Sequence, residues 1–217
     1  MTVKAVIFDL DGTLLNTIDD LKESTNFALS AFGYPTKTKE EVNSFVGDGV
    51  AKLIERAIPN GKDNKDFEPC LQMFKFFYSQ NMLNQTKPYE GIIELLEDLK
   101  SKGIKTAVVS NKFDSAVKEL TKKYFDGLIS VSIGENEKEG IKKKPAPDMV
   151  LKAIQELGVQ TSDTVYVGDS NTDILTAQNT GIPCISVSWG FRTTEFLLKN
   201  GAKTIIDYPS ELLKLLS

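Results

Sequence analysis

The feature that most constrains this chain is an alternation between short apolar runs of strand length and longer amphipathic segments. In the amphipathic segments apolar residues recur every three or four positions, as in Ile92, Leu95, Leu96 and Leu99, which is typical of helices. Continuous apolar runs are typical of strands that a parallel sheet buries on both faces. The alternation therefore predicts an α/β fold with a doubly wound, Rossmann-like parallel sheet. The predicted strands cover residues 3–10, 104–110, 128–133, 164–168, 184–188 and a short stretch near 204–206.

Residues 16–84 interrupt this alternation. Three apolar stripes with helical spacing, which start at Leu21, Val50 and Phe67, occupy the segment, and no run in it is typical of a strand. A helical segment directly after the first strand is typical of an inserted domain. We therefore predict a core domain from residues 1–15 and 85–217 and an inserted helical domain from residues 16–84.

Composition excludes several classes of function. The 217 residues carry 30 acidic and 26 basic side chains, a net charge of −4, so no nucleic-acid partner is expected. No apolar run is long enough to cross a bilayer and no signal peptide is recognised, so we expect a cytoplasmic protein without a membrane partner. Cys70 and Cys184 are expected to be free thiols. The chain has no histidine, which excludes imidazole bases and leaves carboxylates, lysine, tyrosine or cysteine for acid–base chemistry.

Ionisable and hydroxyl side chains follow four of the predicted strands. Ligands of a doubly wound sheet bind beyond the carboxyl ends of its parallel strands, so these side chains are expected to meet at one edge. Clustered carboxylates repel one another unless a cation lies among them, and a few carboxylates with phosphate oxygens are typical ligands of Mg²⁺. The side chains are Asp9, Asp11 and Thr13 at the end of the first strand, Ser110 and Asn111 at the end of the second, Lys144 in the loop after the third, and Asp169 and Asp173 at the end of the fourth.

The predicted cluster is complementary to a phosphoryl group. A divalent cation and Lys144 would offset the charge of the phosphoryl oxygens, and Ser110 would donate a hydrogen bond. One carboxylate could attack phosphorus, and a second one two residues along the chain could protonate the leaving alcohol and then activate water. Each motif alone could be a turn, a helix N-cap or a solvated loop, but their occurrence together, each after a predicted strand, favours a site.

The four motifs resemble those of the haloacid dehalogenase-like (HAD) phosphohydrolases. The segments that carry the resemblance span nearly the whole chain; they are DLDGT at 9–13, Ser110, KPAPD at 144–148 and GDSNTD at 168–173. The resemblance implies a HAD core whose inserted helical segment, residues 16–84, is a cap of the C1 type that closes over the site.

The resemblance also implies a role for each matching residue. Asp9 would be the nucleophile and Asp11 the general acid–base, with an aspartyl-phosphate intermediate. The implied Mg²⁺ ligands are the side chains of Asp9 and Asp169 and the backbone carbonyl of Asp11, with Asp173 in support. The residues implied to bind or orient the phosphoryl group are Thr13, Ser110, Asn111 and Lys144.

Within the family the chain resembles the phosphoglycolate phosphatases most, through DLDGTLLNTIDDL at 9–21, VGDGVAKLIERAI at 46–58 and SWGFRTTEFL at 188–197. The resemblance implies a small phosphorylated metabolite as substrate, 2-phosphoglycolate first. Glycines beside Asp48 would let a cap loop approach the substrate, although Asp48 itself adds a negative charge there. The remaining candidates for substrate contact are Gly47, Gly49 and the only two arginines, Arg56 and Arg192, which are suited to a carboxylate.

Other functions remain open at this point. β-Phosphoglucomutase-like phosphoryl transfer and pyrophosphate hydrolysis would use the same chemistry and differ in their products. A receiver domain that is phosphorylated on aspartate and a non-catalytic metabolite-binding protein belong to other classes. The helical insertion counts against a receiver, and the presence of both Asp9 and Asp11 counts against a loss of catalysis. The sequence leaves open whether the protein is a monomer or a homodimer.

Overall fold

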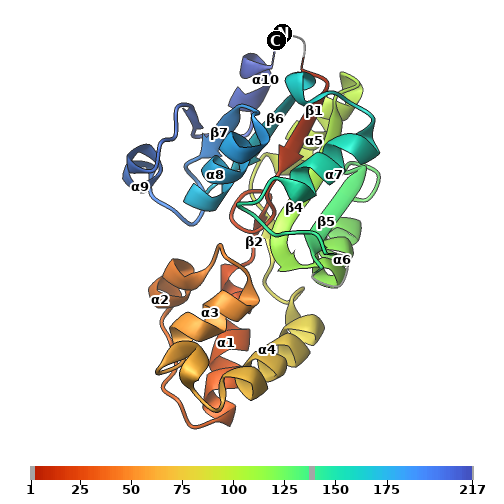
Figure 1. Cartoon of the computed structure of the whole chain (residues 1–217). Helices are drawn as coiled ribbons and strands as arrows, with labels where there is room; N and C mark the ends of the chain where they lie inside the picture. Colours follow the sequence, from red (N-terminus) through yellow and green to blue (C-terminus); the bar gives the residue numbers. More distant parts are fainter. Residues whose placement is uncertain (1–2, 137–139, 217) are drawn as a thin grey trace. The chain divides into compact units, whose positions relative to one another are not determined.

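The structure is a computed structural model that describes residues 3–136 and 140–216. Contacts within the chain divide it into two compact units (Figure 1). The core unit contains Met1–Leu15 and Pro88–Ser217, and the helical unit contains Asn16–Lys87. The chain passes from one unit to the other within two short strands that pair with each other, β2 (Leu15–Asn16) and β3 (Lys87–Pro88).

A parallel sheet forms the centre of the core unit. Its strands are β1 (Ala5–Phe8), β4 (Lys105–Phe113), β5 (Val131–Glu135), β6 (Thr164–Gly168), β7 (Cys184–Val187) and β8 (Ile205–Ile206). They lie in the order β5-β4-β1-β6-β7-β8, and each neighbouring pair is parallel. The first strand of the chain thus lies inside the sheet, with later strands added on both sides of it. This order confirms the predicted doubly wound α/β fold.

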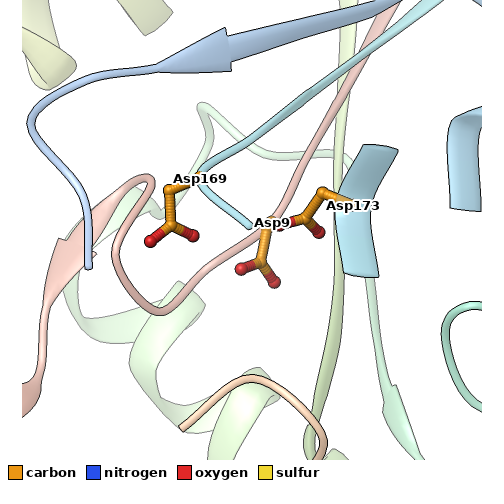
Figure 2. A group of neighbouring side chains, drawn as sticks. All are labelled: Asp9, Asp169 and Asp173. Atoms are coloured by element: carbon orange, nitrogen blue, oxygen red, sulfur yellow. The ribbon is translucent and has the colours of Figure 1, made fainter. Parts of the chain in front are cut away.

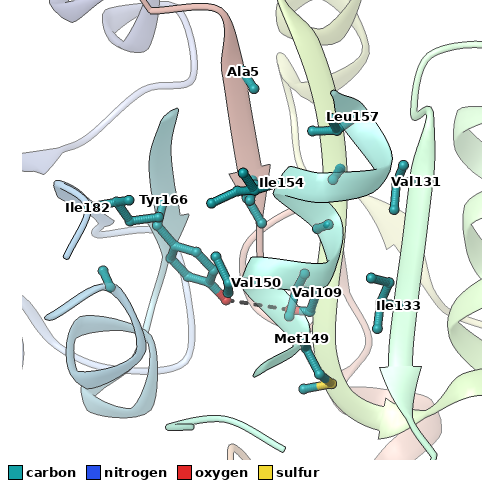
Figure 3. Packing of buried hydrophobic residues seen from close by; sticks show 14 residues of the cluster. Ala5, Val109, Val131, Ile133, Met149, Val150, Ile154, Leu157, Tyr166 and Ile182 are labelled. Atoms are coloured by element: carbon teal, nitrogen blue, oxygen red, sulfur yellow. Dashed lines mark hydrogen bonds between the residues drawn. The ribbon is translucent and has the colours of Figure 1, made fainter. Parts of the chain in front are cut away.

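Helices cover the sheet and complete the core. They are α5 (Ile92–Ser101), α6 (Asp114–Phe125), α7 (Asp148–Leu157), α8 (Asn171–Thr180), α9 (Thr194–Lys199) and α10 (Glu211–Leu215), with the short 3-10 helix η3 (Thr161–Asp163). Val150 and Ile154 of α7 pack in one cluster with Ala5 and Ile7 of β1 (Figure 3). Ala5 and Ile7 share one face of β1 because side chains alternate along a strand. All four residues of β1 are buried, as expected for a strand covered on both faces.

Strand β4 is longer than the sequence predicts. The predicted strand ends at residue 110, whereas β4 continues to Phe113, which pairs with Glu135 of β5. The register of this pairing shifts between Val109 and Phe113. Ser110 and Asn111 therefore lie within an irregular part of the strand rather than at its end. Irregularities of this kind redirect side chains, and these two side chains are buried.

The helical unit contains α1 (Ile18–Ala31), α2 (Lys39–Phe45), the 3-10 helix η1 (Gly61–Asp63), α3 (Val50–Ala57) and α4 (Phe67–Asn81). The stripes that start at Leu21, Val50 and Phe67 correspond to α1, α3 and α4. The sequence pattern missed α2 because this helix buries only Val42 and so has no apolar stripe. Its start is marked instead by a capping box, in which Thr38 and Glu41 satisfy each other's backbone N–H groups.

A buried carboxylate sets the end of the helical unit. Asp20, in the first turn of α1, accepts hydrogen bonds from the backbone N–H groups of Gln85 (3.0 Å) and Thr86 (2.8 Å) and from the Thr86 hydroxyl (2.8 Å). These bonds hold residues 85 and 86 against α1. The helical unit accordingly ends at Lys87, three residues beyond the predicted 84.

The structure also bears on the state of the cysteines and on membrane-spanning segments. Cys70 and Cys184 are both free, as predicted. Among the described residues, no helix combines the length and the apolar character that a membrane span needs.

We predict that Asp20→Ala lowers the free energy of unfolding by about 2–4 kcal/mol, because it leaves two backbone N–H groups without their acceptor. Chemical denaturation followed by circular dichroism measures this loss. Asp19→Ala is the matched control, since Asp19 forms an exposed ion pair with Lys39 (2.8 Å), whose loss is expected to cost less than about 1 kcal/mol. Equal losses in the two variants would contradict the role of Asp20.

Candidate active site

Three aspartates gather at the carboxyl edge of the sheet. Asp9 follows β1, Asp169 follows β6, and Asp173 lies in the first turn of α8 (Figure 2). One carboxylate oxygen from each lies within 4.8 Å of the others, and all three residues are buried. The parallel order of β1 and β6 brings these distant residues together, as the sequence predicted.

Lys144 lies among these carboxylates. Its Nζ atom is 2.7 Å from Oδ1 of Asp9 and 2.7 Å from Oδ1 of Asp173, and it donates a hydrogen bond to the Tyr166 hydroxyl (3.0 Å). Only 3% of the Lys144 side chain is exposed. Desolvating an ammonium group is costly unless it is paired, so the two carboxylates are what allow Lys144 to be buried.

The charges in this cluster do not balance without a further cation. When all are ionised, the three carboxylates and the Lys144 ammonium leave two net negative charges in a buried space. A divalent cation would neutralise them, and the carboxylate oxygens are the ligands that Mg²⁺ prefers. The donor set present therefore fits Mg²⁺.

The pKa values reflect the same imbalance. Burial raises the pKa of Asp9 well above the usual range of a carboxyl group, and Lys144 only partly opposes this. Burial and the neighbouring Asp173 raise the pKa of Asp169 to about 7. For Lys144, burial acts to lower the pKa, but Asp173 and Asp9 raise it above its usual value. The lysine is thus held as a cation, whereas two of the carboxyls would ionise more readily beside a second cation.

Both carboxylate oxygens of Asp173 accept hydrogen bonds from other residues of the protein. Its Oδ2 atom accepts hydrogen bonds from the backbone N–H (3.0 Å) and the hydroxyl (2.6 Å) of Ser170, in the capping box that starts α8. Its Oδ1 atom contacts Lys144 and accepts from the Tyr166 hydroxyl (3.0 Å). Both oxygens thus have partners, which suits a supporting carboxylate better than a direct ligand of an ion.

Asp169 is oriented by two loops. Its Oδ2 accepts from the backbone N–H of Phe191 (2.6 Å), and its Oδ1 accepts from the Thr13 hydroxyl (3.4 Å). The loops approach so closely that only glycine fits at two positions. A Cβ atom at Gly12, where φ is +89°, would lie 2.8 Å from Cγ of Asp169, and one at Gly190 would lie 2.6 Å from the Gly12 carbonyl oxygen. The SWGFR segment therefore contributes to the site through Gly190 and Phe191, a role that sequence reasoning missed.

Asn111 holds the Lys144 loop in place. Its Oδ1 accepts from the backbone N–H of Lys144 (2.8 Å), and its Nδ2 donates to the Lys144 carbonyl (3.0 Å). This two-way bond is the same pattern that adjacent strands use, and it fixes Lys144 relative to β4. The Ser110 hydroxyl oxygen accepts from the backbone N–H of Lys112 (3.2 Å).

Two residues of this edge were not predicted. The Tyr166 hydroxyl lies between Lys144 and Asp173 and donates weakly to the Val109 carbonyl (3.4 Å; Figure 3). A tyrosine in the middle of the apolar run TVYVG was the available signal, because a buried tyrosine hydroxyl needs a partner. Lys112 is also buried, and its Nζ lies 3.0 Å from Oδ1 of Asp11. No sequence pattern separated it from other lysines.

The remaining candidates belong to the helical unit, except Arg192, which belongs to the core unit. Gly47, Asp48 and Gly49 lead into α3 of the helical unit, and Gly49, with φ of +89°, is its N-cap. Arg56 of the same unit donates to Oδ2 of Asp48 (2.5 Å) and to the Phe45 carbonyl (2.7 Å). The charge of Asp48 is thus offset within the helical unit. Arg192, in the core unit, lies 5.8 Å from the ring centre of Phe196 and acts to lower the pKa of Asp169.

A doubly wound sheet with this carboxylate and lysine cluster defines a class of hydrolase, and comparison with known proteins agrees. The model of the haloacid dehalogenase-like hydrolase family matches residues 6–187. The chain belongs to this family, which confirms the resemblance seen in its motifs. The family assignment also makes the receiver-domain alternative wrong.

Individual relatives cover nearly the whole chain. The phosphoglycolate phosphatase of Mannheimia succiniciproducens is 33% identical over 98% of this chain and 97% of that protein. The phosphoglycolate phosphatase of Aquifex aeolicus is 33% identical over 99% of this chain and 97% of that protein. A crystal structure from Lactobacillus delbrueckii subsp. bulgaricus, provisionally named a phosphoglycolate phosphatase, has 36% identity and a TM-score of 0.92 and covers 100% of this chain and 99% of that one.

We predict that Mg²⁺ stabilises the protein and that its affinity rises with pH. Because the pKa of Asp169 is about 7, the ion must displace a proton from Asp169 at pH 6, whereas at pH 8 this carboxyl is already mostly ionised, so the apparent affinity is expected to be at least about tenfold weaker at pH 6. Without the ion, the raised pKa makes the contribution of Asp169 to stability fall as pH rises from about 4 to 7. Thermal unfolding in a Mg²⁺ titration at both pH values measures the effect.

Asp169→Asn is the control for this titration and is expected to lose most of the Mg²⁺-induced rise in melting temperature. Asp163→Asn, just before the start of β6, removes a half-buried aspartate that pairs with Lys4 and is expected to keep this rise. An equal apparent affinity at pH 6 and pH 8 would show that no proton is displaced from Asp169.

Proposed function

We propose that the chain is a Mg²⁺-dependent phosphatase that hydrolyses small phosphomonoesters, with 2-phosphoglycolate as the preferred substrate. The observation that carries the chemistry is the buried set of Asp9, Asp169 and Asp173 around Lys144, with Asp11 next to it. Relatives named phosphoglycolate phosphatase that match both units over nearly their full length support the substrate. The helical unit is proposed to be the cap, and a cytoplasmic location stays a prediction.

Asp9 is the proposed nucleophile. Lys144 holds its Oδ1 atom and so orients the carboxylate, and the other oxygen, Oδ2, attacks phosphorus. A bond forms between Oδ2 and phosphorus while the bond from phosphorus to the leaving oxygen breaks, and Asp11 gives a proton to that oxygen. Water then attacks the aspartyl-phosphate, Asp11 takes its proton, and inorganic phosphate leaves with Asp9 restored as a carboxylate.

The residues proposed to hold Mg²⁺ are Asp9, Asp169 and the backbone carbonyl of Asp11. When bound, the ion supplies positive charge that offsets the phosphoryl oxygens. Asp173 acts through its bonds to Lys144 and Ser170, and Thr13 orients Asp169. Ser110 is proposed to contact the phosphoryl group, and Asn111 to orient Lys144 for the same contact.

The contacts to the rest of the substrate are also proposals. Gly47 and Gly49 permit a close approach of the loop before α3, and Asp48 is already paired with Arg56. Arg56 and Arg192, which the sequence offered as partners of a substrate carboxylate, stay predicted contacts of the substrate. No nucleic-acid or membrane partner is proposed, and a monomer and a homodimer are both compatible with this function.

We predict that Asp9→Asn lowers kcat by more than about a thousandfold, because an amide cannot form the phosphoenzyme. Phosphate release in the presence of Mg²⁺ measures it. The fold is expected to persist, since the change removes one of three mutually repelling charges. Asp11→Asn is also expected to lose turnover, with some phosphoenzyme detectable by intact mass spectrometry. Asp163→Asn serves as the control, and near wild-type turnover in Asp9→Asn would make another residue the nucleophile.

We predict that 2-phosphoglycolate leads a panel of sugar phosphates, pyrophosphate and nucleotides by at least about tenfold in kcat/KM, equivalent to about 1.4 kcal/mol. Phosphate release with Mg²⁺, and with EDTA as the control, measures it. Conversion of a sugar phosphate to its isomer would indicate a mutase, and a lead for pyrophosphate would indicate a pyrophosphatase. Either outcome would keep the chemistry and replace the substrate.

A further inference from the structure

Lys112 is a second buried cation at the edge of the sheet that holds the proposed nucleophile. It lies in the irregular part of β4, two residues after Ser110, and its side chain is 2% exposed. Its Nζ lies 3.0 Å from Oδ1 of Asp11, whose side chain is 12% exposed. Lys112 is thus buried, whereas part of its partner's side chain is accessible from outside.

Lys112 and Lys144 differ in their partners. Lys144 lies between two carboxylates and the Tyr166 hydroxyl, and it contacts the proposed nucleophile. Lys112 contacts the proposed acid–base, Asp11. A group that contacts the acid lies close to the leaving oxygen, since Asp11 must come within hydrogen-bond distance of that oxygen to protonate it. Lys112 is therefore separated from the proposed leaving oxygen by one carboxyl group, that of Asp11, whereas Lys144 contacts the proposed nucleophile.

The position of Lys112 is important for a substrate that carries a carboxylate close to its phosphoryl group. In 2-phosphoglycolate one methylene separates the leaving oxygen from the carboxylate, so the carboxylate oxygens lie only about 3 Å from the leaving oxygen, a distance similar to that of a hydrogen bond. We propose that Lys112 binds the carboxylate of the substrate and is the residue that selects α-phosphoryloxy acids over neutral phosphomonoesters. The inference rests on the proposed function and deepens it by naming the residue and the charge that it recognises.

The surroundings of the arginines make Lys112 the better placed cation. The Arg56 guanidinium already binds Asp48 and the Phe45 carbonyl within the helical unit. Arg192 lies over the ring of Phe196 at 5.8 Å. Lys112 is also paired with a carboxylate, but its partner is Asp11, the residue that would touch the leaving oxygen, and it lies on a strand of the sheet. A cation on a rigid element holds a short anionic group in one geometry more firmly than one on a loop.

The test compares 2-phosphoglycolate with 2-phosphoglycolamide, its uncharged amide of nearly the same shape. The quantity measured is the kcat/KM for 2-phosphoglycolate divided by the kcat/KM for the amide, with saturating Mg²⁺, in the wild type and in Lys112→Gln. Glutamine keeps a hydrogen-bond donor for Asp11 and removes the charge. The ratio is expected to fall at least about tenfold, through a higher KM for 2-phosphoglycolate, because a charge-assisted hydrogen bond is lost.

Three controls separate recognition from a structural role. The inhibition constant of inorganic phosphate is expected to stay within about twofold in Lys112→Gln, since the proposal places Lys112 on the carboxylate and not on the phosphoryl group. Lys112→Arg keeps the charge and is expected to retain most of the ratio. This variant also tests the proposal if Lys112→Gln folds poorly. Lys105→Met removes an exposed lysine from the start of the same strand, about 20 Å away, and is expected to leave the ratio unchanged.

Other outcomes overturn the inference in distinguishable ways. A wild-type ratio near one would remove 2-phosphoglycolate as the preferred substrate, and the proposed function would fail together with the inference. A high wild-type ratio that survives in Lys112→Gln would keep the proposed function and assign the carboxylate to another residue. An equal loss for both substrates, with weaker inhibition by phosphate, would place Lys112 on the phosphoryl group.

Discussion

The structure depends on the ion pairs that Lys144 forms with Asp9 and Asp173. A parallel sheet brings the ends of β1 and β6 to one edge, and the sequence places carboxylates at both. Their mutual repulsion in a buried space would oppose folding. The positive charge of Lys144 offsets part of this repulsion, and a divalent cation would neutralise the two negative charges that remain. The fold therefore keeps buried carboxylates that repel one another, because the proposed chemistry requires them at this edge of the sheet.

Much of the surrounding structure serves to place that lysine. Asn111 binds both the backbone N–H and the carbonyl of Lys144, and the Tyr166 hydroxyl accepts a hydrogen bond from its ammonium group. Asp173 contacts it with one oxygen and caps α8 with the other, so helix start and site geometry are coupled. These contacts explain why strands and helices far apart in the sequence act as one site.

Some of this arrangement could be predicted from the sequence. Asp9, Asp169 and Lys144 were predicted together because strand periodicity shows where each strand ends, and parallel order brings such ends to one edge. Helix α2 was missed because it buries a single residue, and the extension of β4 to Phe113 was missed because pairing with β5 is not a local property. Tyr166 and Lys112 were missed because their significance lies in partners far along the chain, Lys144 and Asp11.

The sequence by itself determined the fold class, the edge of the sheet at which the site forms, and the kind of chemistry, because periodicity and residue type are local properties. Only the tertiary structure decided what each polar atom does. It made Asn111 a support of the Lys144 backbone and gave both oxygens of the Asp173 carboxylate protein partners. It also divided the two buried lysines between Asp9 and Asp11. The physical reason is that a hydrogen bond or an ion pair depends on distances of about 3 Å, which only the packing of the whole core unit sets.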